Sequence, residues 1–196
     1  MRIVQFLPSV FVFLLVYIPF LVSSSVWYIL RTFNCQELKV SRFLTEKGKH
    51  HFIPVMYAER PDRKGNVRRM LLPVVHNLIF LEKDDSRRNM LQMLSECPVS
   101  WYLLRKENSS DPYEIPDKDM TEFRVLCDPT FDDSHFMSRD DADARPGKMV
   151  RVVHGPFAGM TGKLHRVQNK YYFIKTLAGF GVMIRISRWY CKVLES

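Results

Sequence analysis

The chain has 196 residues, of which 46% are hydrophobic and 26% are charged, and its formal net charge is +8. This length allows one medium-sized and one small domain, and the composition excludes a largely disordered chain. The positive excess lies at the C-terminal end, where nine Lys and Arg residues from Gly147 onward stand against one acid. A segment of this charge favours binding to phosphate groups or to an acidic protein surface, although a solvated face has the same composition.

The first part of the chain is apolar. Residues 3–22 contain no charged side chain, and this is about the length that a helix needs to span a bilayer. Three interpretations stay open for residues 1–25: a membrane anchor, a cleaved signal peptide, or a start codon assigned too far upstream. Because a strand-like sequence begins at Val26 without a spacer, we expect the first folded domain to begin there.

The next segments alternate between strand and helix patterns. Val26–Phe33 is rich in β-branched and aromatic residues and predicts a strand. Asn34, with Glu37 three positions later, has the spacing of a capping box and predicts a helix. Residues 52–57 predict a second strand, and residues 70–81, an apolar run broken at Pro73, predict an extended arm followed by a buried strand.

Turn-forming and helix-capping residues mark the boundaries of the remaining elements before residue 128. The polar residues 59–69 predict a turn or a flexible hairpin tip. Asp85 or Ser86 is expected to cap a second helix, residues 100–105 predict a strand, and a third helix is expected from Asp117. This order predicts an α+β domain with a mostly antiparallel sheet flanked by helices.

An acidic segment with little periodicity follows. It predicts a linker at residues 129–145 between a domain at residues 26–128 and a second domain at residues 146–196. Such a linker is expected to let the two domains move independently, with a docked arrangement as the alternative. The aspartates of this segment are Asp128, Asp132, Asp133, Asp140, Asp141 and Asp143.

The reactive side chains form no recognised pattern. The four cysteines are scattered without a CxxC pair, which suits a reduced, cytosolic protein, and the six histidines have no metal-ligand spacing. We therefore expect no metal, no cofactor and no enzymatic activity.

The segment GKMVRVVHGPFAGMTGKLHR, residues 147–166, carries the strongest local signal. Alternating valines followed by a proline and three glycines predict a hairpin, with the glycines allowing positive φ where the chain reverses. The spacing GxxVRVxxGPFxGxxGxL resembles the KOW motif of NusG-type factors and of certain ribosomal proteins. The matching residues are Gly147, Val150, Arg151, Val152, Gly155, Pro156, Phe157, Gly159 and Gly162.

The sequence before this motif favours the transcription factors over the ribosomal proteins. WYILRT at residues 27–32 resembles the opening strand of the NusG N-terminal (NGN) domain, and the resemblance covers nearly everything after Ser25. Residues 72–80 (LPVVHNLIF) and 114–123 (EIPDKDMTEF) are most similar to the UpxY branch, paralogues that act as antiterminators on capsular polysaccharide operons. Housekeeping NusG usually has Phe-Pro-Gly-Tyr where residues 72–75 stand, and this departure favours a specialised paralogue.

The resemblance implies an NGN domain followed by a small, SH3-like KOW β-barrel. It further implies a cytoplasmic monomer that binds RNA polymerase through an apolar patch and suppresses pausing or termination, unless residues 3–22 tether it to a membrane. The resemblance also implies nascent RNA or non-template DNA as partners of the protein, and RNA or a ribosomal protein as the partner of the KOW domain. The alternative function is that of a KOW-type RNA-binding or ribosome-associated protein.

Two sets of residues are candidates for these contacts. For the polymerase they are Trp27, Tyr28, Leu72, Pro73, Val75 and Phe80, with core packing as the alternative role. For nucleic acid or a ribosomal protein they are Arg151, Lys163, Arg166 and Lys170, beside an exposed Phe157 whose alternative role is to plug the barrel end.

Overall fold

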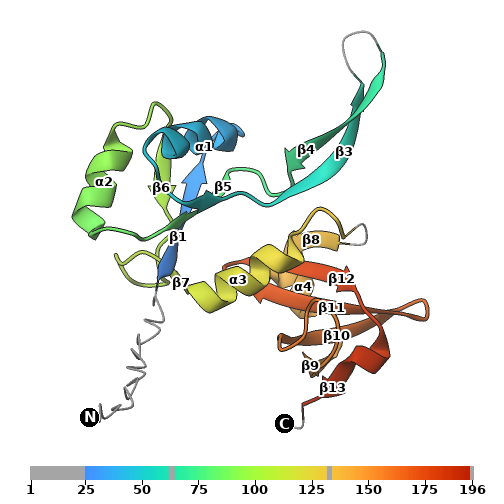
Figure 1. Ribbon diagram of the computed structural model, residues 1–196. Coiled ribbons are helices and arrows are strands. Elements are labelled where there is room, and N and C mark those ends of the chain that lie inside the picture. Colours follow the sequence, from blue (N-terminus) through green and yellow to red (C-terminus); the bar gives the residue numbers. More distant parts are fainter. Residues whose placement is uncertain (1–24, 62–64, 132–133, 195–196) are drawn as a thin grey trace, which may run out of the picture.

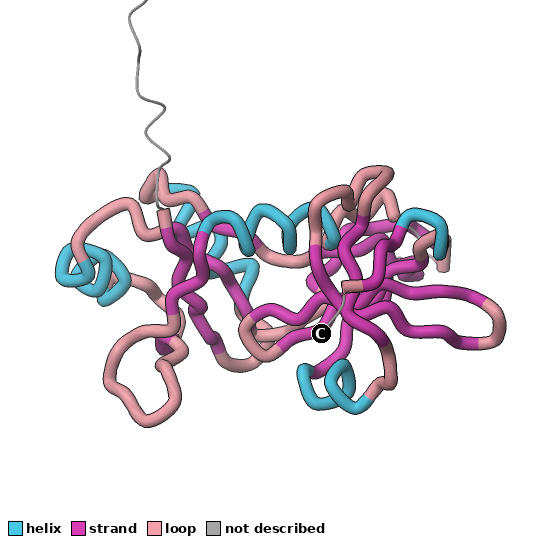
Figure 2. The backbone as a smooth tube through the Cα atoms, turned by 90° about the horizontal axis from the view of Figure 1, so that it is seen from below, coloured by secondary structure: helices cyan, strands magenta, loops and turns pink. Residues whose placement is uncertain are grey.

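The computed structural model describes residues 25–61, 65–131 and 134–194 (Figure 1). The apolar segment at residues 3–22, and with it the choice among its three interpretations, lies outside the described residues. None of the described helices is long and apolar enough to cross a membrane. The described chain forms two lobes, which Figure 2 shows side by side with helices and strands in both.

The N-terminal lobe is built around a central strand, β1 (Val26–Thr32). The sheet has the order β2-β5-β1-β6, with β7 also pairing to β1, and every pairing is antiparallel. This sheet with its flanking helices confirms the predicted α+β class. The other strands are β2 (His51–Phe52), β5 (Leu78–Glu82), β6 (Trp101–Leu103) and β7 (Glu114–Pro116).

Both faces of this sheet are buried. Alternate residues of β1 and β5 point to opposite faces, so Tyr28 and Leu30 pack in one apolar cluster and Ile29 and Phe80 in another. The first cluster is covered by α1 (Glu37–Glu46) and α2 (Arg87–Ser95), and the second by α3 (Asp117–Leu126). Burial on two faces explains why β1 and β5 are almost continuously apolar.

The helix starts agree only partly with the sequence prediction. Ser86 caps α2 as expected, since its hydroxyl accepts a hydrogen bond from the backbone N–H of Asn89 at 3.2 Å. The predicted cap at Asn34 is wrong, because Asn34 has a φ of 54° and lies in a left-handed turn before the helix. Glu37 is buried instead of closing a capping box, and its carboxylate accepts from the backbone N–H of Asn77 at 3.3 Å.

A long hairpin projects from the N-terminal lobe (Figure 1). It consists of β3 (Val55–Pro61) and β4 (Val67–Pro73), which pair only with each other. Sequence analysis ended the first strand at residue 57 and predicted a turn over residues 59–69, whereas the pairing continues to Pro61 and Val67. Because neither face of this ribbon is buried along its outer half, its strands lack the apolar alternation that identifies a strand in a sequence.

The C-terminal lobe is one antiparallel sheet with the order β13-β9-β10-β11-β12-β8. Gln168 and Asn169, with φ values of 45° and 66°, form the tight turn between the third and fourth of these strands. The elements of this lobe are β8 (Ser134–Ser138), α4 (Arg139–Ala144), β9 (Lys148–Val152), β10 (Thr161–Val167), β11 (Lys170–Leu177), β12 (Phe180–Arg185), the 3₁₀ helix η1 (Arg188–Tyr190) and β13 (Cys191–Val193).

The predicted linker at residues 129–145 is largely regular structure. β8 pairs with β12, and Ser138 caps the start of α4, since its hydroxyl accepts a hydrogen bond from the backbone N–H of Asp141 at 3.1 Å. Asp140 and Asp141 lie in the first turn of α4, where the helix dipole stabilises negative charge, and Ala142 is fully buried. The prediction of an irregular linker is therefore wrong for residues 134–144, because charge content concealed a helix N-terminus. Asp132 and Asp133 lie outside the described residues.

The two lobes are packed together in this structure. α3 lies against β11, and an ion pair between Glu122 and Lys175 joins them with side chains only 15% and 14% exposed. A second contact follows the helix, where the rings of Phe131 and Phe157 lie 4.9 Å apart. The structure shows the lobes in contact, as in the docked alternative, and independent motion of the two lobes stays a prediction.

We expect the Glu122–Lys175 pair to hold this arrangement. Glu122→Gln leaves a largely buried ammonium group without its counter-charge, which should lower the free energy of unfolding by about 1.5–3 kcal/mol. Urea unfolding and backbone relaxation would measure the loss and the increased independence of the lobes. The matched control is Glu96→Gln, which breaks the exposed pair with Lys47 and should cost about 0–1 kcal/mol. Equal effects of the two variants would contradict this role.

Candidate functional site

Three of the candidates for polymerase contact belong to the core. Trp27, Tyr28 and Phe80 are 3%, 1% and 0% exposed. The indole N–H of Trp27 donates to Asp117 at 3.0 Å, which joins β1 to the start of α3. Side chains so deeply buried offer no area to a partner, so for these three the structure favours the packing role that sequence analysis left open.

The other three candidates lie where the hairpin joins the lobe. Leu72 and Pro73 are half-buried in β4, and Val75 packs from the following turn against the apolar cluster beneath the sheet. The structure brings Leu72 and Pro73 together with exposed apolar residues that sequence analysis did not single out. We call Tyr57, Met70, Leu71, Leu72 and Pro73 the hairpin patch.

The hairpin patch occupies both faces of the hairpin. Residues directly opposite each other in an antiparallel pair share a face, so Tyr57 and Leu71 lie on one side, and Leu72 lies on the other with its partner Met56. Tyr57, Met70 and Leu71 are 44%, 49% and 47% exposed. Two apolar runs flanking a polar tip with a glycine predict this hairpin, but only the structure shows that its side chains stay uncovered.

The outer half of the hairpin is basic. Arg60 and Arg68 are cross-strand partners, and Arg69 faces Glu59. The guanidinium carbon of Arg69 lies 4.2 Å from the ring centre of Tyr57, which is a cation–π contact. The hairpin therefore presents apolar groups near the lobe and cations further out.

The KOW-like segment forms β9, a loop and the start of β10. Val150 and Val152 are fully buried, and Gly155 and Gly159 have φ values of 84° and 92°, as the motif predicts. Gly162 has no positive φ, so the predicted reason for this glycine is wrong. It lies in a strand, where a Cβ would approach the carbonyl oxygen of the neighbouring strand to 2.5 Å.

Phe157 is not an exposed contact residue. Its side chain is 5% exposed and packs against Phe131 beneath the sheet, which agrees with the alternative of a core role. Pro156 precedes it in the loop, and Gly147 lies at the start of β9, where a Cβ would meet the backbone of Leu164 at 2.6 Å. The apolar KOW-like residues thus build the core of the lobe, whereas Gly147, Arg151, Gly155, Pro156 and Gly159 are exposed.

The four basic candidates do not lie together. Arg151 is exposed on β9, opposite Thr161. The ammonium group of Lys163 donates to the carbonyl oxygens of Ala142, Asp143 and Arg145 at 3.0–3.1 Å, so it holds the end of α4.

The other two basic candidates flank one turn. Arg166 and Lys170 lie on either side of the turn between β10 and β11, and Arg166 donates to the side-chain oxygen of Asn169 at 2.6 Å. The guanidinium carbon of Arg166 lies 5.5 Å from the ring centre of Tyr171. Lys170 lies opposite Val167, the residue next to Arg166, so the two cations point to opposite faces of the hairpin.

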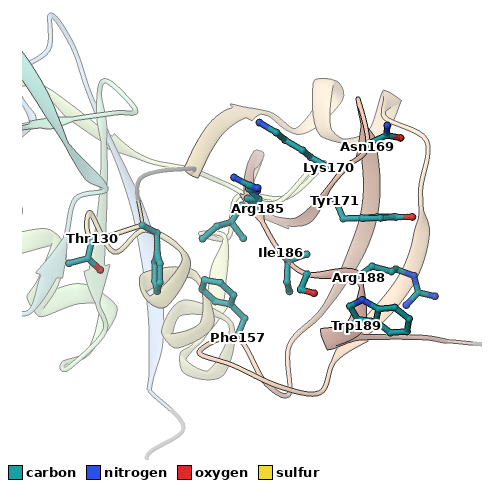
Figure 3. A pocket seen from close by; sticks show the side chains of 12 residues that line it. Thr130, Phe157, Asn169, Lys170, Tyr171, Arg185, Ile186, Arg188 and Trp189 are labelled. Carbon is teal, nitrogen blue, oxygen red and sulfur yellow. The ribbon is translucent and has the colours of Figure 1, made fainter.

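A cavity of about 770 Å³ opens beside this turn (Figure 3). Its lining combines apolar Phe157 and Ile186 with Lys170, Arg188 and Trp189, and Figure 3 shows Arg188 and Trp189 at one end and Lys170 at the other. Sequence analysis missed Arg188 and Trp189. The sequence feature that could have identified them is the clustering of arginine with aromatic residues in RISRWY at residues 185–190.

The buried thiols add no reactive group to these surfaces. Burial raises the pKa of the Cys127 thiol far above its usual range, and burial likewise raises the pKa of Cys191. Both thiols therefore stay protonated and unreactive at neutral pH.

Comparison with known proteins gives two findings. A family model described as NusG, transcription termination factor nusG, matches residues 25–124. A solved structure of Thermotoga maritima NusG, described as showing domain interaction, has a TM-score of 0.50 over 87% of this chain and 98% of that chain, with 15% sequence identity. At this identity the likeness concerns the fold. A search of the curated proteins found no match.

Proposed function

The chain belongs to the NusG family of transcription factors, and from this premise we propose that it binds RNA polymerase and promotes elongation through pause or termination sites. The family match covers nearly the whole N-terminal lobe, from the start of β1 into α3, and includes the hairpin. We therefore assign polymerase binding to this lobe. A polymerase partner would place the protein in the cytoplasm.

The observation that supports this assignment best is the hairpin patch. A two-stranded hairpin is at best marginally stable in water, yet this one carries apolar side chains that are about half exposed on both faces. Exposed apolar groups on a projecting arm are typical of a protein-binding surface. We propose that the polymerase covers the hairpin patch. Val75 packs against the apolar cluster of the lobe and so holds the base of the hairpin in place.

The basic outer half of the hairpin fits the same assignment. A protein that sits on a transcribing polymerase lies close to nucleic acid, and Arg60, Arg68 and Arg69 of the hairpin provide positive potential there. In this arrangement the hairpin patch provides most of the affinity for the polymerase, and the arginines add a salt-dependent part of the binding free energy.

Binding to purified core RNA polymerase tests this function directly. We expect the full chain to co-migrate with core polymerase in gel filtration and to increase read-through of a terminator in single-round transcription. No binding, or binding without any effect on pausing or termination at any template, would contradict the proposal.

We further propose that the factor acts on particular operons, as members of the UpxY branch do on polysaccharide operons. The two UpxY-like segments lie at the end of β4 with β5, and in β7 with α3. A test compares read-through on the leader of the gene's own operon with read-through on an unrelated leader. Equal read-through on both would contradict operon specificity.

For the C-terminal lobe we propose a KOW-type domain beginning after residues 129–133, so that β8 and α4 belong to it. The KOW-like spacing at residues 147–166 and the antiparallel sheet support this interpretation. The second candidate function, a KOW-type RNA-binding or ribosome-associated protein, is favoured by the nine Lys and Arg residues from Gly147 onward, which stand against one acid. It would predict ribosome or RNA binding without polymerase binding.

A further inference from the structure

The hairpin is joined to the N-terminal lobe at its base (Figure 1). β3 and β4 pair only with each other, so no other strand of the described residues fixes the direction of the hairpin. The chain enters the hairpin from the short strand β2 and leaves it through the turn at residues 74–77, which leads into β5. The backbone N–H of Val74 donates to the carbonyl oxygen of Pro54 at 3.1 Å and closes the base. The direction of the hairpin therefore depends on how these two connections are held.

Asn77 binds the exit turn to the end of β1 and to the turn before α1. Its side-chain oxygen accepts hydrogen bonds from the hydroxyl of Thr32 at 3.3 Å and from the backbone N–H of Cys35 at 2.8 Å. Its backbone carbonyl oxygen accepts from the backbone N–H of Thr32 at 3.2 Å. Asn77 thus receives three hydrogen bonds from a segment that lies 42–45 residues earlier in the chain.

A buried carboxylate completes this connection. Glu37 is 2% exposed, and its carboxylate accepts a hydrogen bond from the backbone N–H of Asn77 at 3.3 Å. The other carboxylate oxygen lies 3.3 Å from Nδ1 of His76. Because a carboxylate taken out of water is unfavourable without such partners, Glu37 binds strongly to the turn at residues 74–77. We call Thr32, Cys35, Glu37, His76 and Asn77 the hairpin clamp.

Left-handed backbone conformations gather at the hairpin clamp. Asn34, Cys35 and Asn77 have φ values of 54°, 52° and 60°, and they are three of the seven residues other than glycine with positive φ in the described chain. Such conformations are unfavourable for these residue types and persist where the surrounding structure holds them. The hydrogen bonds between the two turns offset this cost, so each turn depends on the other.

We propose that the hairpin clamp sets the direction in which the hairpin leaves the lobe and thereby the affinity for the polymerase. This inference rests on the proposed function, in which the polymerase covers the hairpin patch. Thr32 and Glu37 are too deeply buried to touch a partner, so they are positioning residues that act through the hairpin. Residues of a strand are spaced about 3.3 Å apart, so a rotation of about 20° at Pro73 would move Arg68 by about 5 Å. A displacement of this size would separate the hairpin from a surface that it fits.

The test compares Asn77→Gly with Asn77→Asp in the full chain. Glycine permits the positive φ but removes the side-chain oxygen, whereas aspartate keeps an acceptor at the same place. The affinity for core polymerase should fall about tenfold in Asn77→Gly, because the hydrogen bonds that preorganise the hairpin are lost, and should stay within about twofold of wild type in Asn77→Asp. The matched control is Leu94→Ala, which removes a fully buried side chain from α2 of the same lobe. It should lower the stability at least as much and leave the affinity unchanged, with circular dichroism showing that all variants are folded.

Residual dipolar couplings of the backbone N–H groups measure the direction of the hairpin without any polymerase. In wild type the couplings of residues 55–61 and 67–73 should fit the same alignment tensor as those of the sheet. In Asn77→Gly they should fit it only after the hairpin is rotated as a separate body.

Three results would overturn the proposal. They are unchanged couplings in Asn77→Gly, an unchanged affinity of this variant for a polymerase that wild type binds, and equal losses of affinity in Asn77→Gly and Leu94→Ala, which would show an effect of stability alone. Failure of the proposed function would appear separately, as the absence of binding by wild type, and the couplings would still decide whether the hairpin clamp sets the direction of the hairpin.

Discussion

Leu71→Glu should abolish binding to core RNA polymerase while the free protein stays folded. Leu71 is 47% exposed on the hairpin, so the new carboxylate is hydrated in the free protein. If the polymerase covers this position, the carboxylate loses its water. Arg69 lies on the same face of the hairpin, but its guanidinium is already held over the ring of Tyr57. An unpaired charge buried in this way costs about 3–5 kcal/mol, which corresponds to a loss of affinity by more than a factor of about 100.

The matched control for this prediction is Leu38→Glu. Leu38 is 48% exposed and lies on α1 of the same lobe, so it introduces the same charge at the same exposure outside the hairpin. Gel filtration with core polymerase and terminator read-through are the measurements, with circular dichroism as the folding control. A folded Leu71→Glu protein that binds as well as Leu38→Glu would rule out the hairpin patch as the docking surface.

The choice of Leu71 over Val75 follows from the structure. Val75 is also a candidate for polymerase contact on sequence grounds, as a member of the expected apolar patch. In the structure its side chain packs against the apolar cluster beneath the sheet. A glutamate there would disturb the fold, so loss of binding would not identify a contact.

The elements that were predicted correctly have their cause in nearby residues. β1 is apolar because both of its faces are covered, α2 begins at a serine that caps it, and α3 carries aspartates in its first turn. In each case the pattern that forms the element is contained in the element itself. The prediction failed for β8, which depends on pairing with the distant strand β12, and for the outer half of the hairpin, whose strands lack apolar alternation because neither face is buried.

The candidate sites were predicted less well for a related reason. The pattern that marks an aromatic residue for binding also marks it for the core, and Trp27, Tyr28 and Phe80 satisfy both descriptions. Exposure decides between the two roles, and exposure is set by residues far away in the chain. Trp189 shows the converse case, because only the structure reveals that this indole has no packing partner to explain it.

The interpretation of Gly162 leads to the largest expected change in stability. A Cβ at this position would lie 2.5 Å from the carbonyl oxygen of Ile174 and 2.7 Å from ring atoms of Phe173. The carbonyl belongs to β11, which pairs with β10 through Lys163 and Ile174, and the Phe173 ring is fully buried. Neither neighbour can withdraw without breaking the sheet or moving the core.

Gly162→Ala should therefore lower the free energy of unfolding of the C-terminal lobe by about 3 kcal/mol or more, at the upper end of what overpacking costs. Gly159→Ala is the matched control: its Cβ meets nothing within 4 Å, but its φ of 92° makes alanine unfavourable by about 1–2 kcal/mol. Urea unfolding of both variants, followed by circular dichroism, gives the comparison. If Gly162→Ala lowered the free energy of unfolding no more than Gly159→Ala does, the close approach of β10 and β11 would not be the reason for glycine at position 162. The role in the turn that the motif predicts would then be the better explanation.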